Sequence, residues 1–307
     1  MNYLLGFDCG ATNSEAAAAD TEGNILHSFI GKPANFLVIG SSRASENILS
    51  LIKECRDELN CDYEDIKSIV IGAAGAGREE DAAKLKSALL NSTSNNGITI
   101  KLLTVMGDAE IALEGAFPDT SGSIVIAGTG SIIYGKDEKG KIYRAGGFGR
   151  IVGDEGSGYS IGRKAIQYVA KFYDGSVKNS DIVNSFINKY DVNSTEKLLQ
   201  KVYKENFDIA SAAELVLDSA GMGDKTALTI LKEESDELIL QIKTLMKKMN
   251  VSKMNISFAG SLILNKNVYS DMLKEKIKNS IADVTVVKAR NSPVQGAINI
   301  ARKMLNE

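Results

Sequence analysis

The first residues of the chain form short apolar runs that are separated by small polar turns. Residues 4–8 (LLGFD), 15–20 (EAAAAD) and 25–31 (ILHSFIG) are the runs, and the turns between them are rich in Gly, Asn and Thr. Glycine and asparagine accept the dihedral angles of tight corners. The pattern therefore predicts three consecutive strands joined by hairpins, and not a strand that leads into a helix.

Longer amphipathic segments then alternate with apolar runs. Helical periodicity is found in residues 44–59, 79–92 and 108–117. A strand that ends in a glycine turn is predicted at residues 67–77, and another strand at 98–107. Strands that alternate with helices predict an α/β sheet with helices packed on it.

The hairpin pattern returns in the middle of the chain. Residues 123–135 (SIVIAGTGSIIYG) place a Gly/Thr turn between two apolar strands, and a charged corner and a third strand follow. We interpret this as a duplicated architecture, although the letters themselves differ. The predicted domains are residues 1–117 and 118–292. Helices fill about 163–250 of the second domain, and a last helix at about 293–307 is expected to pack back on the first domain.

Composition and charge argue against several classes of protein. The chain has 307 residues, of which 44% are hydrophobic and 24% charged, and its formal net charge is −3. No excess of basic residues favours nucleic acid or an anionic membrane as a partner. The start of the chain does not resemble a signal peptide. We expect a reducing cytoplasm, and we do not expect a disulfide framework or a histidine-based site, because the cysteines and histidines are few: Cys9, Cys55, Cys61 and His27.

Two turns have the composition that phosphate binding needs. Backbone N–H groups must approach a phosphate closely, so glycines and small hydroxyl residues are favoured. Residues 8–14 (DCGATNS) and 127–131 (AGTGS) both fit. Either turn alone is more simply an ordinary hairpin corner. Their occurrence at matching positions of two similar halves favours a shared phosphate-binding role.

Three acidic positions could carry chemistry. Asp8 ends a buried strand, where a carboxylate is costly without a cation or hydrogen bonds. Asp108 follows a strand and opens a helix, so it is a helix N-cap, a general base for a sugar hydroxyl, or both. Asp154 lies in the glycine-dense segment 146–158 (GGFGRIVGDEGSG), for which we favour a loop that contacts a ligand through Asp154 over a loose surface loop.

Two further positions remain open on the residues alone. Asn35 follows the first group of strands and either binds a sugar or satisfies a turn. Gly260 and Ser261 end the strand predicted in the segment 254–263, and they either face an adenine or start a helix.

These motifs together resemble the BadF/BadG/BcrA/BcrD ATPase-type family of the actin, Hsp70 and sugar kinase superfold. Within that family the chain is most similar to N-acetylglucosamine kinase and to bacterial amino-sugar and muramic-acid kinases. The matching motifs are FDCGATNS, GDAEIAL, AGTGS, GGFGRIVGDEGSGYSIG, AGMGDKTA, FAGS and SPVQGA, and they occur in order along nearly the whole chain.

The resemblance implies two ribonuclease-H-like domains with ATP and sugar in an interdomain cleft, and a homodimer. It implies that Asp108 is the general base and that Asp8 holds Mg²⁺ through water. The implied sugar contacts are Asn35, Asp154, Gly146, Gly147, Thr129 and Ser131. The implied nucleotide contacts are Gly10, Thr12, Asn13, Gly128, Thr129, Gly130, Gly260 and Ser261. The substrate expected is N-acetylglucosamine, N-acetylmuramic acid or glucosamine.

The chain departs from the family pattern at two positions. Phe148 replaces the tryptophan that is often found in the family's GGWG hallmark. Ile132 follows AGTGS, where N-acetylglucosamine kinase has a polar residue. Ile132 leaves recognition of the acyl or amino group open. Some relatives activate a partner enzyme through an iron–sulfur cluster held by cysteines. An ATPase that regulates a partner, without a sugar substrate, is therefore the alternative, and the lack of cysteines in the hallmark and downstream segments argues against it.

Overall fold

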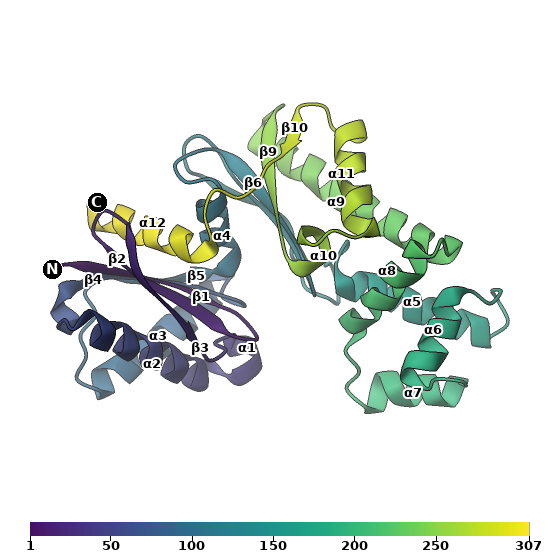
Figure 1. Ribbon diagram of the computed structural model, residues 1–307, viewed down its shortest axis with the longest axis horizontal. Coiled ribbons are helices and arrows are strands. Elements are labelled where there is room, and N and C mark those ends of the chain that lie inside the picture. The colour runs from purple at the N-terminus through teal and green to yellow at the C-terminus, as the bar shows by residue number, and fades with distance from the viewer. Residues whose placement is uncertain (307) are drawn as a thin grey trace. The chain divides into compact units, whose positions relative to one another are not determined.

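The computed structural model describes residues 1–306, and the chain folds into two compact units. The first unit consists of Met1–Ser121 together with the segment that begins at Lys288, and the second unit consists of Gly122–Val287. Each unit contains a five-stranded sheet with helices packed on it (Figure 1). The expected α/β fold class is confirmed.

The sheet of the first unit has the order β3-β2-β1-β4-β5. The first three strands pair antiparallel, whereas β4 and β5 run parallel to β1. The strands are β1 (Tyr3–Cys9), β2 (Ser14–Asp20), β3 (Ile25–Gly31), β4 (Ile66–Ala73) and β5 (Leu103–Gly107). The carboxyl ends of β1, β4 and β5 therefore lie at one edge of the sheet.

Helices cover both faces of this sheet. They are α1 (Phe36–Ile39), α2 (Ser41–Leu59), α3 (Glu79–Asn95), α4 (Asp108–Ala116) and α12 (Pro293–Asn306), with a 3₁₀ turn at Tyr63–Asp65. Alternate strand residues point to opposite faces. Phe7 and Ile71 pack toward α2 and α3, whereas Leu4 and Val70 pack toward α4 and α12. Figure 1 shows α2 and α3 on one side of the sheet and α12 on the other.

The sheet of the second unit has the order β10-β9-β6-β7-β8. Its strands are β6 (Gly122–Ala127), β7 (Ser131–Lys136), β8 (Ile142–Gly146), β9 (Met254–Ala259) and β10 (Val284–Val286). An antiparallel meander of three strands is again extended by two parallel strands. The two units thus repeat one topology, as the duplicated hairpin pattern in the sequence suggested.

The second unit carries most of the helices. They are α5 (Gly158–Tyr173), α6 (Asp181–Tyr190), α7 (Thr195–Lys204), α8 (Ala212–Gly221), α9 (Lys225–Met249), α10 (Ser261–Leu264) and α11 (Val268–Ser280), with a 3₁₀ turn at Ile209–Ser211. A single apolar core joins the sheet to α5, α8, α9 and α11. In the described part of the chain, no helix combines the length and the apolar character needed to cross a bilayer.

Two sequence predictions need correction. The strand predicted at 98–107 is shorter, because the pairing of β4 with β5 starts only at Leu103. The strand predicted to end at Gly260-Ser261 ends slightly earlier, at Ala259, and Ser261 begins α10. Helix α1 was not predicted, since four residues are too few to show helical periodicity.

Helices α4 and α12 cross with almost no space between their backbones. A Cβ atom on Gly296 would lie 1.9 Å from the carbonyl oxygen of Ile111 and 2.5 Å from the backbone nitrogen of Gly115. A Cβ atom on Gly115 would lie 2.4 Å from the carbonyl oxygen of Ser292. Because backbone atoms cannot move aside as a flexible side chain can, both positions require glycine.

We therefore expect Gly296→Ala to lower the free energy of unfolding by about 1–3 kcal/mol or more, the usual range for overpacking. Gly221→Ala is the matched control, because Gly221 ends α8 with open space where its Cβ would be. Scanning calorimetry of both variants tests this. Equal melting temperatures for the two variants would contradict the backbone contact between α4 and α12.

Candidate active site

The carboxyl edge of the first sheet brings two aspartates together. Asp8 is paired in register with Gly72 on β4, and the neighbouring pair is Ala73 with Gly107 on β5. Asp108 follows Gly107 directly and is the first residue of α4, whose N-cap is Gly107. The N-cap role considered for Asp108 is thus wrong by one residue. The Asp108 carboxylate instead accepts a hydrogen bond from the N–H of Ala109 at 2.9 Å.

The surroundings of these aspartates raise their pKa values. Burial, with the charges of Asp108 and Glu15, raises the pKa of Asp8 from 3.8 to about 7. Partial desolvation also raises the pKa of Asp108, against the opposing effect of the hydrogen bond from Ala109. The side chain of Asp108 is nevertheless exposed. It is a carboxylate of increased basicity that a substrate can reach.

The turn between β1 and β2 lies at the same edge. The N–H of Gly10 donates to the carbonyl oxygen of Asn13 at 3.0 Å, and a Cβ on Gly10 would lie 2.9 Å from that oxygen. Thr12 and Asn13 are exposed at the tip. This geometry leaves the backbone of a tight glycine turn accessible to an anion.

Asn35 is held against this turn. The N–H groups of Ala34 and Asn35 donate to the carbonyl oxygen of Gly10 at 3.1 and 3.2 Å. The side-chain Oδ1 of Asn35 is buried without a hydrogen-bond partner, and a buried acceptor that stays unpaired is unfavourable. Asn35 is also the N-cap of α1 but makes no side-chain capping bond. Its side chain is thus not used for the turn, which favours the binding role of the two considered.

The second unit contains the corresponding turn between β6 and β7. The N–H of Gly128 donates to the carbonyl oxygen of Gly130 at 2.9 Å. The first residues of α5 bind the other side of this turn, since Gly158 N–H donates to Gly128 at 2.8 Å and Tyr159 N–H donates to Thr129 at 3.1 Å. The tip residue Thr129 is exposed.

The glycine-dense loop folds onto the same turn. Asp154, in the left-handed region with φ 61°, lies against Gly130, where an added Cβ would lie 2.9 Å from Asp154 Oδ2. Its carboxylate accepts hydrogen bonds from the N–H groups of Gly149 and Ser131. The Ser131 hydroxyl donates to the carbonyl oxygen of Glu155 at 2.7 Å. The 146–158 segment is therefore an ordered loop and not a loose one.

Gly146 ends β8, and Gly147 follows it at the start of this loop. Both have φ 70°. An added Cβ would meet Gln241 at Gly146 and Ile132 at Gly147. Ile132, the position that departs from the family pattern, thus packs against one of the glycines that we expected to contact the sugar.

A cavity of about 420 Å³ in the second unit extends from this turn. Gly128, Thr129 and Gly158 line one end, and Ser261 and Leu262 line another part. Gly260 has φ 85°, and a Cβ there would lie 2.4 Å from the carbonyl oxygen of Ala127. Only glycine lets the start of α10 approach β6 so closely. Ser261 is the first residue of α10, as one alternative expected, and it also lines the cavity.

Sequence reasoning missed the remaining walls of this cavity. They come from two segments, and the residues are Asp208, Ala210, Ser211, Ala213, Glu214, Leu217, Asn265, Lys266 and Asn267. Small residues allow close packing there: a Cβ on Gly162 of α5 would lie 2.0 Å from the carbonyl oxygen of Ile209. The only signal in the sequence was the run of small and polar residues at 208–213, which is also common in helix connections.

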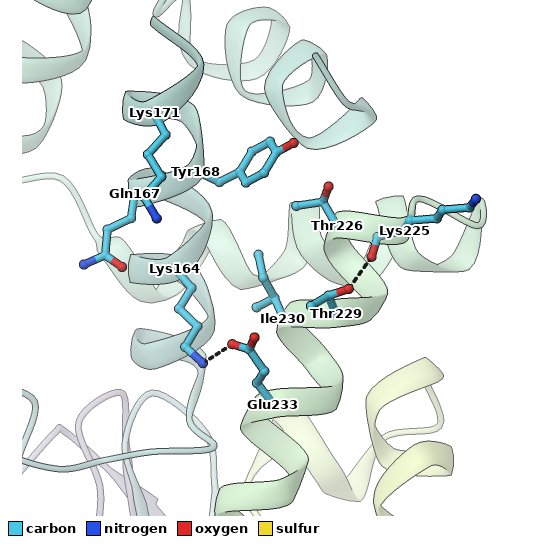
Figure 2. Close-up of a pocket in the computed structure, with 9 residues that line it drawn as sticks. All are labelled: Lys164, Gln167, Tyr168, Lys171, Lys225, Thr226, Thr229, Ile230 and Glu233. Carbon is cyan, nitrogen blue, oxygen red and sulfur yellow. Dashed lines mark hydrogen bonds and ion pairs between the residues drawn. The ribbon is translucent and has the colours of Figure 1, made fainter. Parts of the chain in front are cut away.

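A second cavity, of about 450 Å³, lies between α5 and α9 (Figure 2). It contains none of the predicted site residues. The amino group of Lys164 on its wall is bound to Glu233 at 2.7 Å, and Figure 2 shows the amino group of Lys225 pointing away from Lys164 and Lys171. The lysines therefore do not converge on a common anion.

The fold defines the class of protein first. The chain resembles the solved structure of a putative N-acetylglucosamine kinase from Chromobacterium violaceum, with a TM-score of 0.77 and 20% identity over 100% of this chain and 99% of that one. The sequence profile of the BadF/BadG/BcrA/BcrD ATPase family matches residues 5–301. The chain belongs to this family, and the resemblance drawn from its motifs is confirmed.

Two curated relatives cover almost the whole chain. An N-acetylmuramic acid/N-acetylglucosamine kinase from Clostridium acetobutylicum is 32% identical over 98% of this chain and 99% of the relative. An N-acetyl-D-glucosamine kinase from Dictyostelium discoideum is 26% identical over 97% of each chain. Both relatives are sugar kinases, the class that the motifs predicted for this chain.

The raised pKa of Asp8 gives a test of the first-unit site. In metal-free protein, a carbon-13 NMR titration should place the Asp8 carboxyl near 7, and Asp108→Asn should lower that value because a neighbouring negative charge is removed. Asp137→Asn, a change in the second unit, is the control and should leave the pKa of Asp8 unchanged.

The same shift predicts the dependence of stability on pH. The folded state holds the Asp8 proton more tightly than the unfolded state, so Asp8 should lower stability as pH rises from about 4 to about 7. An Asp8 pKa near 4 would contradict both expectations.

Proposed function

We propose that this protein transfers the γ-phosphoryl group of ATP to a hydroxyl group of an amino sugar: N-acetylglucosamine, N-acetylmuramic acid or glucosamine. Membership of an ATPase family supports the use of ATP. The activities of the two curated relatives support an amino sugar as acceptor. The observation that carries the proposal is the placement of Asp108, an exposed carboxylate of raised pKa beside Asp8.

In the proposed reaction Asp108 accepts the proton of the attacking sugar hydroxyl. Phosphoryl transfer relies mostly on positioning and on neutralisation of charge, and an acidic group near the nucleophile is its recurring general base. A carboxylate with a raised pKa is a better proton acceptor, and its exposure lets a substrate reach it. Its hydrogen bond to Ala109 N–H fixes the carboxylate at the start of α4.

The proposed nucleotide contacts are the two glycine turns and the 420 Å³ cavity. Gly10, Thr12 and Asn13 in the first unit, and Gly128, Thr129 and Gly130 in the second, are assigned to the phosphates. Gly260 and Ser261 are assigned to the adenosine end of the cavity, which continues from Thr129 to Ser261 within the second unit.

Asp8 fits a cation. Its pKa is raised by burial and by neighbouring negative charge, so a divalent cation nearby would favour the ionised carboxylate. We assign Asp8 to Mg²⁺, held through water. When bound, the ion would neutralise charge on the phosphates, and it usually binds through few carboxylates together with phosphates and water.

The proposed sugar contacts are Asn35, Asp154, Gly146, Gly147, Thr129 and Ser131. The unpaired Oδ1 of Asn35 can accept a hydrogen bond from a sugar hydroxyl. Asp154 already accepts two backbone N–H groups, which fix its orientation, and a carboxylate has room for further donors.

A coupled ADP-release assay over a panel of sugars tests the substrate class. We expect N-acetylglucosamine, N-acetylmuramic acid or glucosamine to accelerate ADP release, with glucose and mannose as neutral comparison sugars. ADP release that no sugar accelerates, combined with capture of a specific protein partner, would instead favour the ATPase that regulates a partner enzyme.

Asp108→Asn should lower kcat by about 10²–10⁴-fold, the usual contribution of a positioned general base, while ATP still binds. Glu110→Gln is the control, because Glu110 lies on the same helix and only accepts the N–H of Gly107. Its kcat should stay within about threefold of wild type, since a glutamine retains the acceptor. If Asp108→Asn keeps near-normal turnover, Asp108 is not the base.

A further inference from the structure

Glu234 is a buried carboxylate that none of the motifs singled out. It lies on α9 with 1% of its surface exposed. Its Oε2 accepts the N–H of Gly156 at 2.6 Å, and its Oε1 accepts the hydroxyl of Ser160 at 2.9 Å. Both donors belong to the start of α5 and the end of the glycine-dense loop, so one side chain joins α9 to this junction.

The same junction holds the second-unit phosphate turn. Ser157 is the N-cap of α5, and the next two residues donate their N–H groups to Gly128 and Thr129. The hydroxyl of Tyr269 donates to the carbonyl oxygen of Gly156 at 2.9 Å. Two buried side chains, from α9 and α11, thus fix both polar groups of the Gly156 backbone, two residues before the first bond to the turn.

Glu234 is paired with a lysine. Lys164 lies 3.0 Å from Glu234 and 2.7 Å from Glu233. Burial alone would lower the pKa of Lys164, but its hydrogen bonds with both glutamates outweigh burial and raise it. Figure 2 shows the pair of Lys164 and Glu233 on the wall of the cavity between α5 and α9. Buried charges are tolerated when they are paired and hydrogen-bonded in this way.

Gly156 itself requires this close approach. It has φ 84°, and a Cβ there would lie 2.3 Å from Leu238, one helical turn beyond Glu234 on α9. The loop is therefore pressed against α9 at the point where Glu234 binds its N–H. This arrangement leaves little freedom for the residues that follow, and the phosphate turn depends on them.

We propose that Glu234 is a positioning residue of the nucleotide site: it fixes the start of α5, and through it the Gly128–Thr129 turn, in the conformation that binds phosphates. The proposal rests on the kinase function proposed above. Glu234 touches no substrate. Its effect should therefore appear in the affinity for ATP more than in the affinity for the sugar.

Glu234→Ala tests the proposal by leaving the N–H of Gly156 and the hydroxyl of Ser160 without their acceptor. We expect the Kd for ATP and the KM for ATP to rise about 10- to 100-fold, because two buried donors lose their acceptor and each unmade bond costs roughly tenfold, with the sugar KM within about twofold. Glu233→Gln is the matched control. It removes a negative charge beside Lys164, but Glu233 binds no residue of the loop, so the KM values should stay unchanged.

A double variant separates hydrogen bonding from charge. Glu234→Gln retains one acceptor but leaves Lys164 facing an amide, whereas Glu234→Gln with Lys164→Met removes both charges and keeps the acceptor. The double variant should bind ATP within about threefold of wild type and more tightly than Glu234→Ala. If the double variant and Glu234→Ala lose the same affinity for ATP, the hydrogen bonds to the loop do not position the turn.

General destabilisation needs its own control. Ile277→Ala removes a buried side chain of α11 that is 1% exposed, and it should lower the melting temperature without raising the KM for ATP. If Ile277→Ala raises the KM for ATP as much as Glu234→Ala does at a similar melting temperature, Glu234 has only a structural role.

The two proposals can fail separately. ATP binding is measured by calorimetry without sugar. Wild-type protein that binds no ATP would overturn the proposed kinase function. Wild-type protein that binds ATP, with Glu234→Ala binding it equally well, would overturn the positioning role alone.

Discussion

The parallel pairing of β1, β4 and β5 is the constraint on which the first-unit site depends. Parallel strands in register bring their carboxyl ends to one edge, so Asp8 and Asp108 become neighbours although one hundred residues separate them. This edge also requires a glycine on β4: a Cβ on Gly72, directly opposite Asp8, would lie 2.2 Å from the side chain of Ile111 on α4. Because Gly72 has no side chain, α4 can pack closely enough for its first residue, Asp108, to reach this edge.

The second unit uses the same strand order but completes its edge differently. Its β6–β7 turn is bound from behind by the first N–H groups of α5, whereas the β1–β2 turn is bound through the carbonyl oxygen of Gly10 by residues 34–35. Each turn thus accepts two N–H groups from the segment behind it. In the second unit, Glu234 and Tyr269 also fix the Gly156 backbone just before the start of α5.

The sequence predicted the elements and turns that local chemistry specifies. Apolar runs and glycine corners placed the two hairpins, and the Gly/Thr pattern placed their turns, because strand periodicity and turn residues are local properties. The walls of the 420 Å³ cavity were not predictable in this way. Asp208 and Asn267 meet there only after α8 and α11 pack on the sheet, and each looks like an ordinary helix-capping residue, a role that both also perform. Glu234 was missed for a related reason, since a glutamate in a long helix is usually exposed.

Charge explains why the negative side chains of the site must be controlled individually. Asp8, Asp108 and Asp154 all lie at or near turns assigned to phosphates, and the chain has a net charge of −3. A carboxylate beside a phosphate is repulsive unless a proton, a cation or hydrogen bonds offset its charge. Burial and neighbouring negative charge raise the pKa of Asp8 to about 7, which favours its protonated form, and Asp154 accepts two backbone N–H groups. Of these three carboxylates Asp108 alone is exposed, and it accepts only local N–H groups, those of Ala109 and of Asp108 itself. This exposure is what suits it to the proposed role of general base.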